Sequence, residues 1–122
     1  MNAFQKAVYR RQVMIALKRM EAKRYTLLRI PRDANGMPAG IGEPVGVFFG
    51  LRYIREDNFR SLLIAMPGIT LDHAQNERVF GVMLDGGTPK IEDTLIELPE
   101  LGRIMEVREH FGIYVLTMEG TR

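Results

Sequence analysis

The stretch that decides the fold is RIMEVREHFGIYVLTME, residues 103–119, in which two β-type runs are joined by a short connection. Residues 103–109 and residues 112–119 each have the length and the apolar content of a strand. The connection between them, His110-Phe111-Gly112, contains a glycine and is short enough to be a tight turn. This stretch therefore predicts a β-hairpin.

The last of these strands is apolar on both faces. Successive side chains of a strand point to opposite faces of the sheet. Ile113 and Val115 therefore point one way, and Tyr114, Leu116 and Met118 point the other. A sheet face that is apolar where it should meet water is expected to be covered, either by an N-terminal helix or by another chain.

Five more β-type runs precede this hairpin. They are residues 25–30, 45–53, 61–66, 78–84 and 93–98. Short strands with turn signals every 8–14 residues are typical of a small barrel or sandwich. We therefore expect a mainly β fold, a small barrel or sandwich of six to seven short antiparallel strands, in a domain that spans residues 25–122.

A basic N-terminal α-helix is predicted ahead of this domain, within residues 1–24. Gly and Pro are absent from residues 3–24, and Asn2 is a plausible N-cap. A helix packed only on its own domain needs one apolar stripe, but this one has two, on roughly opposite sides. They are Phe4, Val8, Ile15 and Ala22, and Tyr9, Val13, Leu17 and Met20. The extra stripe suggests a contact with something else, such as a neighbouring subunit.

The charge of the chain is divided by position. Residues 1–32 hold nine Lys or Arg and one acid, whereas residues 33–122 hold eight basic and fourteen acidic residues. A basic arm ahead of an acidic body indicates a charged partner or assembly with copies of itself. The basic residues expected to contact a partner or DNA are Lys6, Arg10, Arg11, Lys18, Arg19, Lys23 and Arg24.

Three interpretations of this basic helix stay open. In the first interpretation, the basic side chains form a solvated face of the helix, and the stems of Lys and Arg cover apolar surface. Alternatively, it docks on an acidic protein surface, such as the body of a neighbouring copy, in a head-to-tail contact that closes into a ring. The third interpretation is contact with nucleic-acid phosphates, which adjacent basic pairs such as Arg10-Arg11 favour.

A long loop interrupts the β-type runs. Residues 31–44 contain three Pro and three Gly, and Asn35-Gly36 is a strong turn signal. Loops of this length in small domains are often functional or disordered. The candidate contact residues here are Asn35, Gly36 and Met37. The loop is either a mobile hairpin tip or an extension that reaches a partner or the lumen of a ring.

The sequence offers no catalytic constellation. It has no Cys, its two histidines, His73 and His110, are far apart, and Ser61 lacks the flanking glycines of a nucleophile elbow. Glu92 and Asp93 are adjacent, so in extended chain they point to opposite sides. We therefore expect that the protein is not an enzyme and that it has no catalytic residue, no cofactor and no metal. No apolar run is long enough to span a bilayer, and we expect no membrane partner.

The carboxyl-terminal third resembles a known family. Residues 88–119 read TPKIEDTLIELPELGRIMEVREHFGIYVLTME, with a Pro-containing turn, an acidic residue opening a strand, a short turn and two further strands. This pattern is similar to the end of the small β-barrel head-tail joining proteins of tailed bacteriophages, the head-closure or stopper group.

The resemblance implies a structural virion protein of the phage neck, assembled in the host cytoplasm. Such a protein forms a homo-oligomeric ring at the head-tail junction, helps to retain packaged DNA, and joins head to tail. Its implied partners are other copies of itself, portal, adaptor or tail proteins, and packaged DNA. The alternative that the residues leave open is a nucleic-acid-binding small β-barrel with a basic helical arm.

Overall fold

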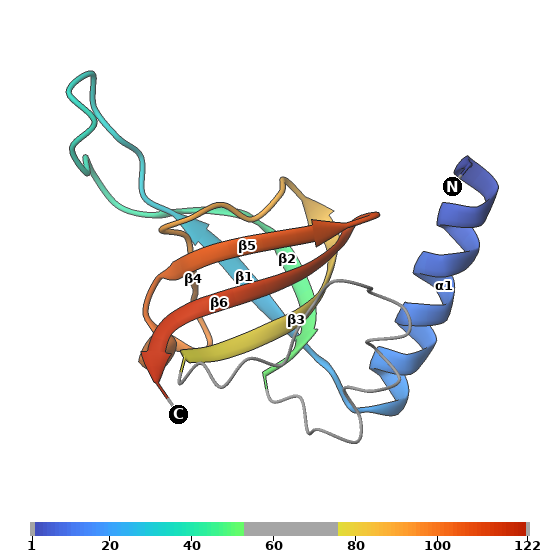
Figure 1. Ribbon diagram of the computed structural model, residues 1–122. Helices are drawn as coiled ribbons and strands as arrows, with labels where there is room; N and C mark the ends of the chain where they lie inside the picture. Colours follow the sequence, from blue (N-terminus) through green and yellow to red (C-terminus); the bar gives the residue numbers. More distant parts are fainter. Residues whose placement is uncertain (1, 53–75, 122) are drawn as a thin grey trace.

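The computed structural model describes residues 2–52 and 76–121 (Figure 1). Within these residues the fold is mainly β, with one N-terminal helix and six antiparallel strands, as predicted. The elements in chain order are α1 (Ala3–Arg19), β1 (Lys23–Arg29), β2 (Glu43–Leu51), β3 (Asn76–Gly86), β4 (Thr94–Leu95), the 3-10 helix η1 (Pro99–Leu101), β5 (Ile104–His110) and β6 (Ile113–Thr121). The predicted strand at 61–66 lies outside the described residues.

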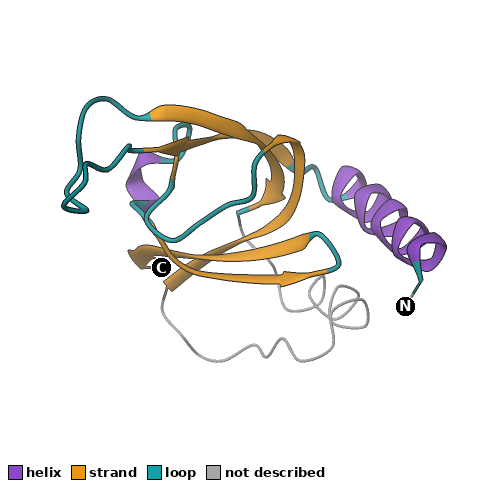
Figure 2. Cartoon of the chain, turned by 90° about the horizontal axis from the view of Figure 1, so that it is seen from above, coloured by secondary structure: helices purple, strands orange, loops and turns teal. Residues whose placement is uncertain are grey.

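The strands form one sheet in the order β4-β1-β2-β3-β6-β5. The sheet curls into a half-barrel, which Figure 2 shows from above. Its two edge strands meet where Thr94 pairs with Arg103 in an isolated antiparallel bridge. Beside this bridge the Ile104 N–H donates to the Asp93 carbonyl over 2.8 Å. The sheet edges are therefore tied together by backbone hydrogen bonds at this end.

The predicted turn between the last two strands is confirmed. His110 pairs with Ile113, which leaves Phe111 and Gly112 as a two-residue loop. Both loop residues have positive φ, 52° and 82°, which is the backbone of a type I′ turn. The Gly112 N–H donates to Glu109 Oε1 over 2.6 Å. This loop matches the right-handed twist of β5 and β6 and sets their register.

The predicted strand at 93–98 is mostly wrong. Only Thr94–Leu95 pairs as β4, and the chain then turns through Leu98 into η1. Pro99 begins that short helix, and a proline has no N–H to offer a sheet ladder. The Ile96 N–H still reaches the Thr26 carbonyl at 3.0 Å, so pairing with β1 ends one residue beyond β4.

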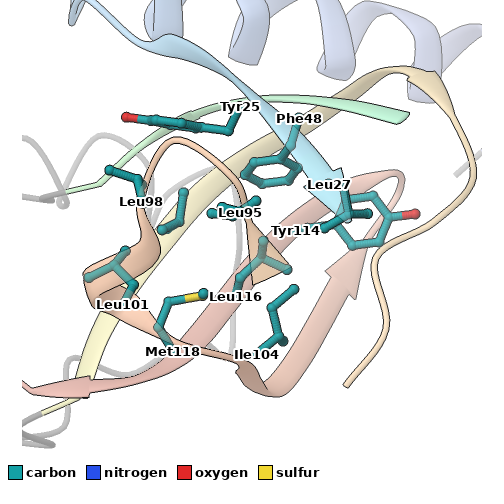
Figure 3. Packing of buried hydrophobic residues seen from close by; sticks show 11 residues of the cluster. Tyr25, Leu27, Phe48, Leu95, Leu98, Leu101, Ile104, Tyr114, Leu116 and Met118 are labelled. Atoms are coloured by element: carbon teal, nitrogen blue, oxygen red, sulfur yellow. The ribbon is translucent and has the colours of Figure 1, made fainter. Parts of the chain in front are cut away.

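The interior of the half-barrel is one apolar core. Figure 3 shows its side chains converging from the strands and from η1. Phe48, Leu27 and Leu116 are fully buried there. The complete set is Tyr25, Leu27, Phe48, Val79, Leu95, Leu98, Leu101, Ile104, Tyr114, Leu116 and Met118. Bulky side chains therefore fill the inside of the sheet.

A second apolar cluster lies on the opposite face of the sheet, beneath α1. Ile113 and Val115 of β6 belong to it, together with Val13 and Leu17 of the helix. Leu17 is fully buried, and Val13 is 3% exposed. The expectation that the second apolar face of β6 would be covered is confirmed, and the cover is the chain's own helix.

The predicted helix end is wrong. The helix begins as expected, with Asn2 and Gln5 capping each other's backbone N–H groups, but it ends at Arg19 and not at residue 24. Glu21 adopts a left-handed backbone with φ 61°, which stops the helix. Lys23 and Arg24 then pair with Gly50 and Phe49 as the start of β1. The ladder with β2 overrides the local helix propensity of these residues.

Candidate functional site

Helix α1 carries a concentration of positive charge with no acid among its residues. Its exposed cations are Lys6, Arg10, Arg11, Lys18 and Arg19. Two of them contact the body: Arg10 Nη2 donates to the Met83 carbonyl over 2.8 Å, and Lys6 Nζ lies 5.3 Å from the Phe111 ring centroid. None of the five forms an ion pair within the described residues. The charge of α1 is therefore not neutralised by the described body.

The two apolar stripes of α1 have different surroundings. Val13 and Leu17 are buried against the sheet, and Tyr9 and Met20 pack beside them. The opposite stripe is exposed, with exposed fractions of 77% for Phe4, 40% for Val8 and 46% for Ile15. Ala22, which the sequence assigned to that stripe, lies beyond the helix end and packs against the apolar cluster beneath α1. One stripe thus holds the helix to its own body, and the other has no described partner.

The apolar stripe of α1 that faces the sheet includes Tyr9, whose ring packs among other aromatic side chains. The Tyr9 ring lies 5.9 Å from the His110 ring and 6.1 Å from the Phe111 ring, both edge-on. The Tyr9 hydroxyl is buried without a hydrogen-bond partner among the described residues, and burial raises the pKa of Tyr9. His110 therefore belongs to the packing of α1 on the β5–β6 turn.

Lys23 and Arg24 are separated from the helix set. Both are exposed on β1 and line a groove that also contains Glu97. Burial alone would raise the pKa of Glu97, but hydrogen bonds from the Thr26 hydroxyl and N–H, at 2.7 Å each, together hold it below its ordinary value. Arg11, Lys18 and Arg19 are not among the described residues that line this groove.

The long Gly/Pro-rich loop forms an ordered arm, defined here as residues 31–42. The Asp33 carboxylate accepts hydrogen bonds from the N–H groups of Asn35 and Met37, at 2.9 and 3.0 Å. The Asp33 N–H donates to the Met37 carbonyl, and Gly36 takes a positive φ of 77° in the turn. These hydrogen bonds close the tip of the arm into a tight turn.

The base of the arm is tied to the loop before β4. Arg32 forms an ion pair with Glu92, and Arg29 Nη2 lies 2.8 Å from Asp93 Oδ2. Asp93 is only 2% exposed and also accepts from the Lys90 N–H. Glu92 and Asp93 therefore have different partners, but the predicted extended chain is wrong here, because Glu92 lies in a turn with φ 76°. A shallow cavity of about 550 Å³ lies here, lined by apolar Ile30, Pro38 and Ile91 and by charged residues that include both ion pairs.

The arm presents apolar side chains to solvent. Met37 is 61% exposed and Ile41 is 90% exposed, the largest exposed fraction among the described large apolar residues. Figures 1 and 2 both place the arm and α1 on opposite sides of the half-barrel. The chain therefore has two exposed apolar surfaces on opposite sides of the half-barrel. One is the outer face of α1, which is also basic, and the other is carried by the arm.

No metal-ligating group of three or more His, Asp or Glu residues occurs within residues 2–52 and 76–121. Two residues considered for chemistry, His73 and Ser61, lie outside those ranges. Among the described helices, none is long and apolar enough to cross a membrane. Comparisons of this chain with protein-family profiles, curated proteins and solved structures find no match.

Several residues of these surfaces were missed by sequence reasoning. Asp33 was not singled out, although an Asp two residues before Asn-Gly is a common signal for a side-chain-capped turn. Ile41 carried no signal, because an isolated apolar residue in a Gly-rich loop has no periodicity to show which way it points. The Arg10 contact with Met83 joins residues 73 positions apart, and such contacts depend on tertiary structure.

Proposed function

We propose that this protein is a structural assembly protein of a bacteriophage neck. It forms a ring at the head-tail junction, helps to retain packaged DNA, and joins head to tail. The observation that carries this proposal is the outer face of α1, where an exposed apolar stripe lies beside cations that have no acidic partner in the described chain. The phage assignment itself comes from the resemblance of residues 88–119.

The arrangement of the surfaces supports a ring. A head-to-tail contact needs two different patches on each subunit. It closes into a ring when the rotation from one subunit to the next brings the last copy back to the first. The outer face of α1 and the arm are two such patches, and they lie on opposite sides of the half-barrel (Figure 1). The remaining exposed surface is then available to portal, adaptor or tail proteins and to packaged DNA in the virion.

One observation favours the alternative, a nucleic-acid-binding barrel. Arg11, Lys18 and Arg19 are exposed and unpaired within the described chain, and phosphates bind such cations. The exposed stripe argues against it, because Phe4 and Ile15 lie among these cations and a phosphate backbone would leave them in water. A protein surface that is acidic and apolar satisfies both kinds of side chain.

The test is the mass of the purified protein in solution at low and high salt, with and without DNA, and with portal or adaptor proteins. We expect a defined multimer, or a monomer that assembles on a neck partner. A monomer that ignores these partners, binds DNA at low salt and releases it at high salt would overturn the proposal. That outcome would establish the nucleic-acid alternative.

A further inference from the structure

The outer face of α1 sets two requirements for whatever covers it. Phe4, Val8 and Ile15 require apolar contacts, since leaving them in water forgoes the free energy of burial. Arg11 and Arg19 lie close to this stripe on the helix and require negative charge. The partner must therefore present a few apolar side chains among acidic groups.

The arm of the same chain has these properties. The arm contains one acid, Asp33, and one base, Arg32, whose charge is paired with Glu92, and a second acid, Glu43, follows the arm at the start of β2. Met37 and Ile41 lie between the two acids in sequence and are strongly exposed. Glu43 is exposed at the start of β2 and forms no ion pair within the described residues. The negative charges of Asp33 and Glu43 and the apolar side chains of the arm thus complement the outer face of α1.

The arm is also organised in advance of any contact. The Asp33 hydrogen bonds shape its tip, the Ala39 N–H donates to the Pro31 carbonyl over 2.8 Å, and the Arg32–Glu92 ion pair holds its base. A segment that is already ordered loses less conformational entropy on binding than a flexible one. An ordered arm with an apolar tip is therefore suited to docking.

We propose that the arm of one copy docks on the outer face of α1 of the next copy, a contact that rests on the proposed function. Met37 and Ile41 cover the stripe formed by Phe4, Val8 and Ile15, while Asp33 and the adjoining Glu43 face the cations of α1. Within one chain the two surfaces lie on opposite sides of the half-barrel, so the contact forms between copies (Figure 2). Its head-to-tail geometry is the one that closes a ring.

Two single substitutions test the contact from either side. Ile41→Asp changes the arm at a side chain that is 90% exposed, and Ile15→Asp changes α1 at one that is 46% exposed. Each places a charge where the proposal requires apolar contact. We expect each variant to weaken self-association by roughly tenfold to a hundredfold, as loss of a central interface residue does. Ile96→Asp is the matched control, because Ile96 is 49% exposed on a different surface.

The sharper experiment mixes the two variants. The Ile15→Asp copy keeps an intact arm, and the Ile41→Asp copy keeps an intact α1 face. An equimolar mixture should therefore form dimers with one good contact and nothing larger, whereas each variant alone stays monomeric. Sedimentation velocity separates these species, and urea unfolding of each variant checks that it is folded.

The outcomes separate this contact from the proposed function. If the wild type forms rings and both variants do so equally well, the arm contact is wrong and the ring proposal stands. If each variant is monomeric but their mixture yields no dimer, the two surfaces do not face each other. A wild type that stays monomeric at millimolar concentration also overturns the contact. Assembly of that monomer on a portal or adaptor would keep the neck proposal, and binding to DNA alone would favour the alternative.

Discussion

Replacing Leu17 by alanine tests how α1 is held on the sheet. Leu17 is fully buried in the cluster beneath the helix, where Phe49 and Phe80 of the sheet are also buried. Val13 is the other buried residue of α1. The interior core contains no residue of α1, so the helix is attached through one apolar cluster while the half-barrel has its own.

The expected cost follows from the size of the cavity. Truncating a fully buried leucine to alanine removes about 2–5 kcal/mol, depending on how far the surroundings collapse. The flexible side chains of Met14 and Met20 pack against this cluster and can fill part of the space, so we expect about 3 kcal/mol, in the lower half of that range. The loss acts on the docking of α1, and it corresponds to roughly a hundredfold increase in the opening equilibrium of the helix.

Hydrogen exchange of backbone amides measures this opening one segment at a time. In Leu17→Ala the amides of the second half of α1 should exchange roughly a hundredfold faster. Those around Leu116 in β6 should change much less, because the interior core is intact. Ile15→Ala is the control, since Ile15 lies on the same helix, is 46% exposed, and should cost less than about 1 kcal/mol.

Two results would refute this reasoning. Equal effects of Leu17→Ala and Ile15→Ala would mean that the two sides of the helix are equally buried, or equally exposed, in solution. Uniform loss of protection over α1 and β6 would mean that the two apolar clusters unfold as one cooperative unit and that α1 does not open independently.

Three further predictions concern the arm and the body. Asp33→Ala removes the side-chain acceptor of two arm N–H groups, so the amides of Asn35 and Met37 should lose protection in hydrogen exchange while urea unfolding of the body changes by less than about 0.5 kcal/mol. Asp93→Ala leaves the Arg29 guanidinium without its buried partner and should cost about 3 kcal/mol in urea unfolding, the lower end of the usual range because Arg29 is 35% exposed; no loss would contradict the pairing. The lowered pKa of Glu97 means that its stabilising contribution is present above its unfolded-state value, near pH ~4.3, and is lost as pH falls through the lower folded-state value. Replacing Glu97 by Gln should therefore flatten the stability profile in acid, and an unchanged profile would exclude this contribution.

Much of the half-barrel followed from local patterns. Runs of β-type residues between turn signals placed β2, β3, β5 and β6, because such runs are typical of strands. The start of α1 followed from Asn2, since an N-cap side chain accepts a hydrogen bond from a backbone N–H group in the first turn of its helix. The β5–β6 turn followed from Gly112, whose positive φ of 82° is accessible to glycine at low cost.

Other features depended on contacts between distant parts of the chain. Lys23 and Arg24 have good helix propensity, yet they join β1. Pairing with β2 gives their backbone groups hydrogen-bond partners as part of a continuous strand ladder. The sequence showed that α1 had two apolar stripes but not which one its own sheet would bury. That choice is made by Val13 and Leu17 packing against side chains from β2, β3 and β6.

The sequence alone thus determined what local sterics and local hydrogen bonds specify: most of the strands, a helix start, the β5–β6 turn, and the uneven distribution of charge. The tertiary structure decided which apolar surfaces are buried and which remain exposed. It buried the stripe of Leu17, left the stripe of Phe4 and Ile15 exposed, and set the arm on the opposite side of the half-barrel. The physical reason is that burial depends on the packing of all the elements together, and residues far apart in sequence supply the groups that cover or expose one another.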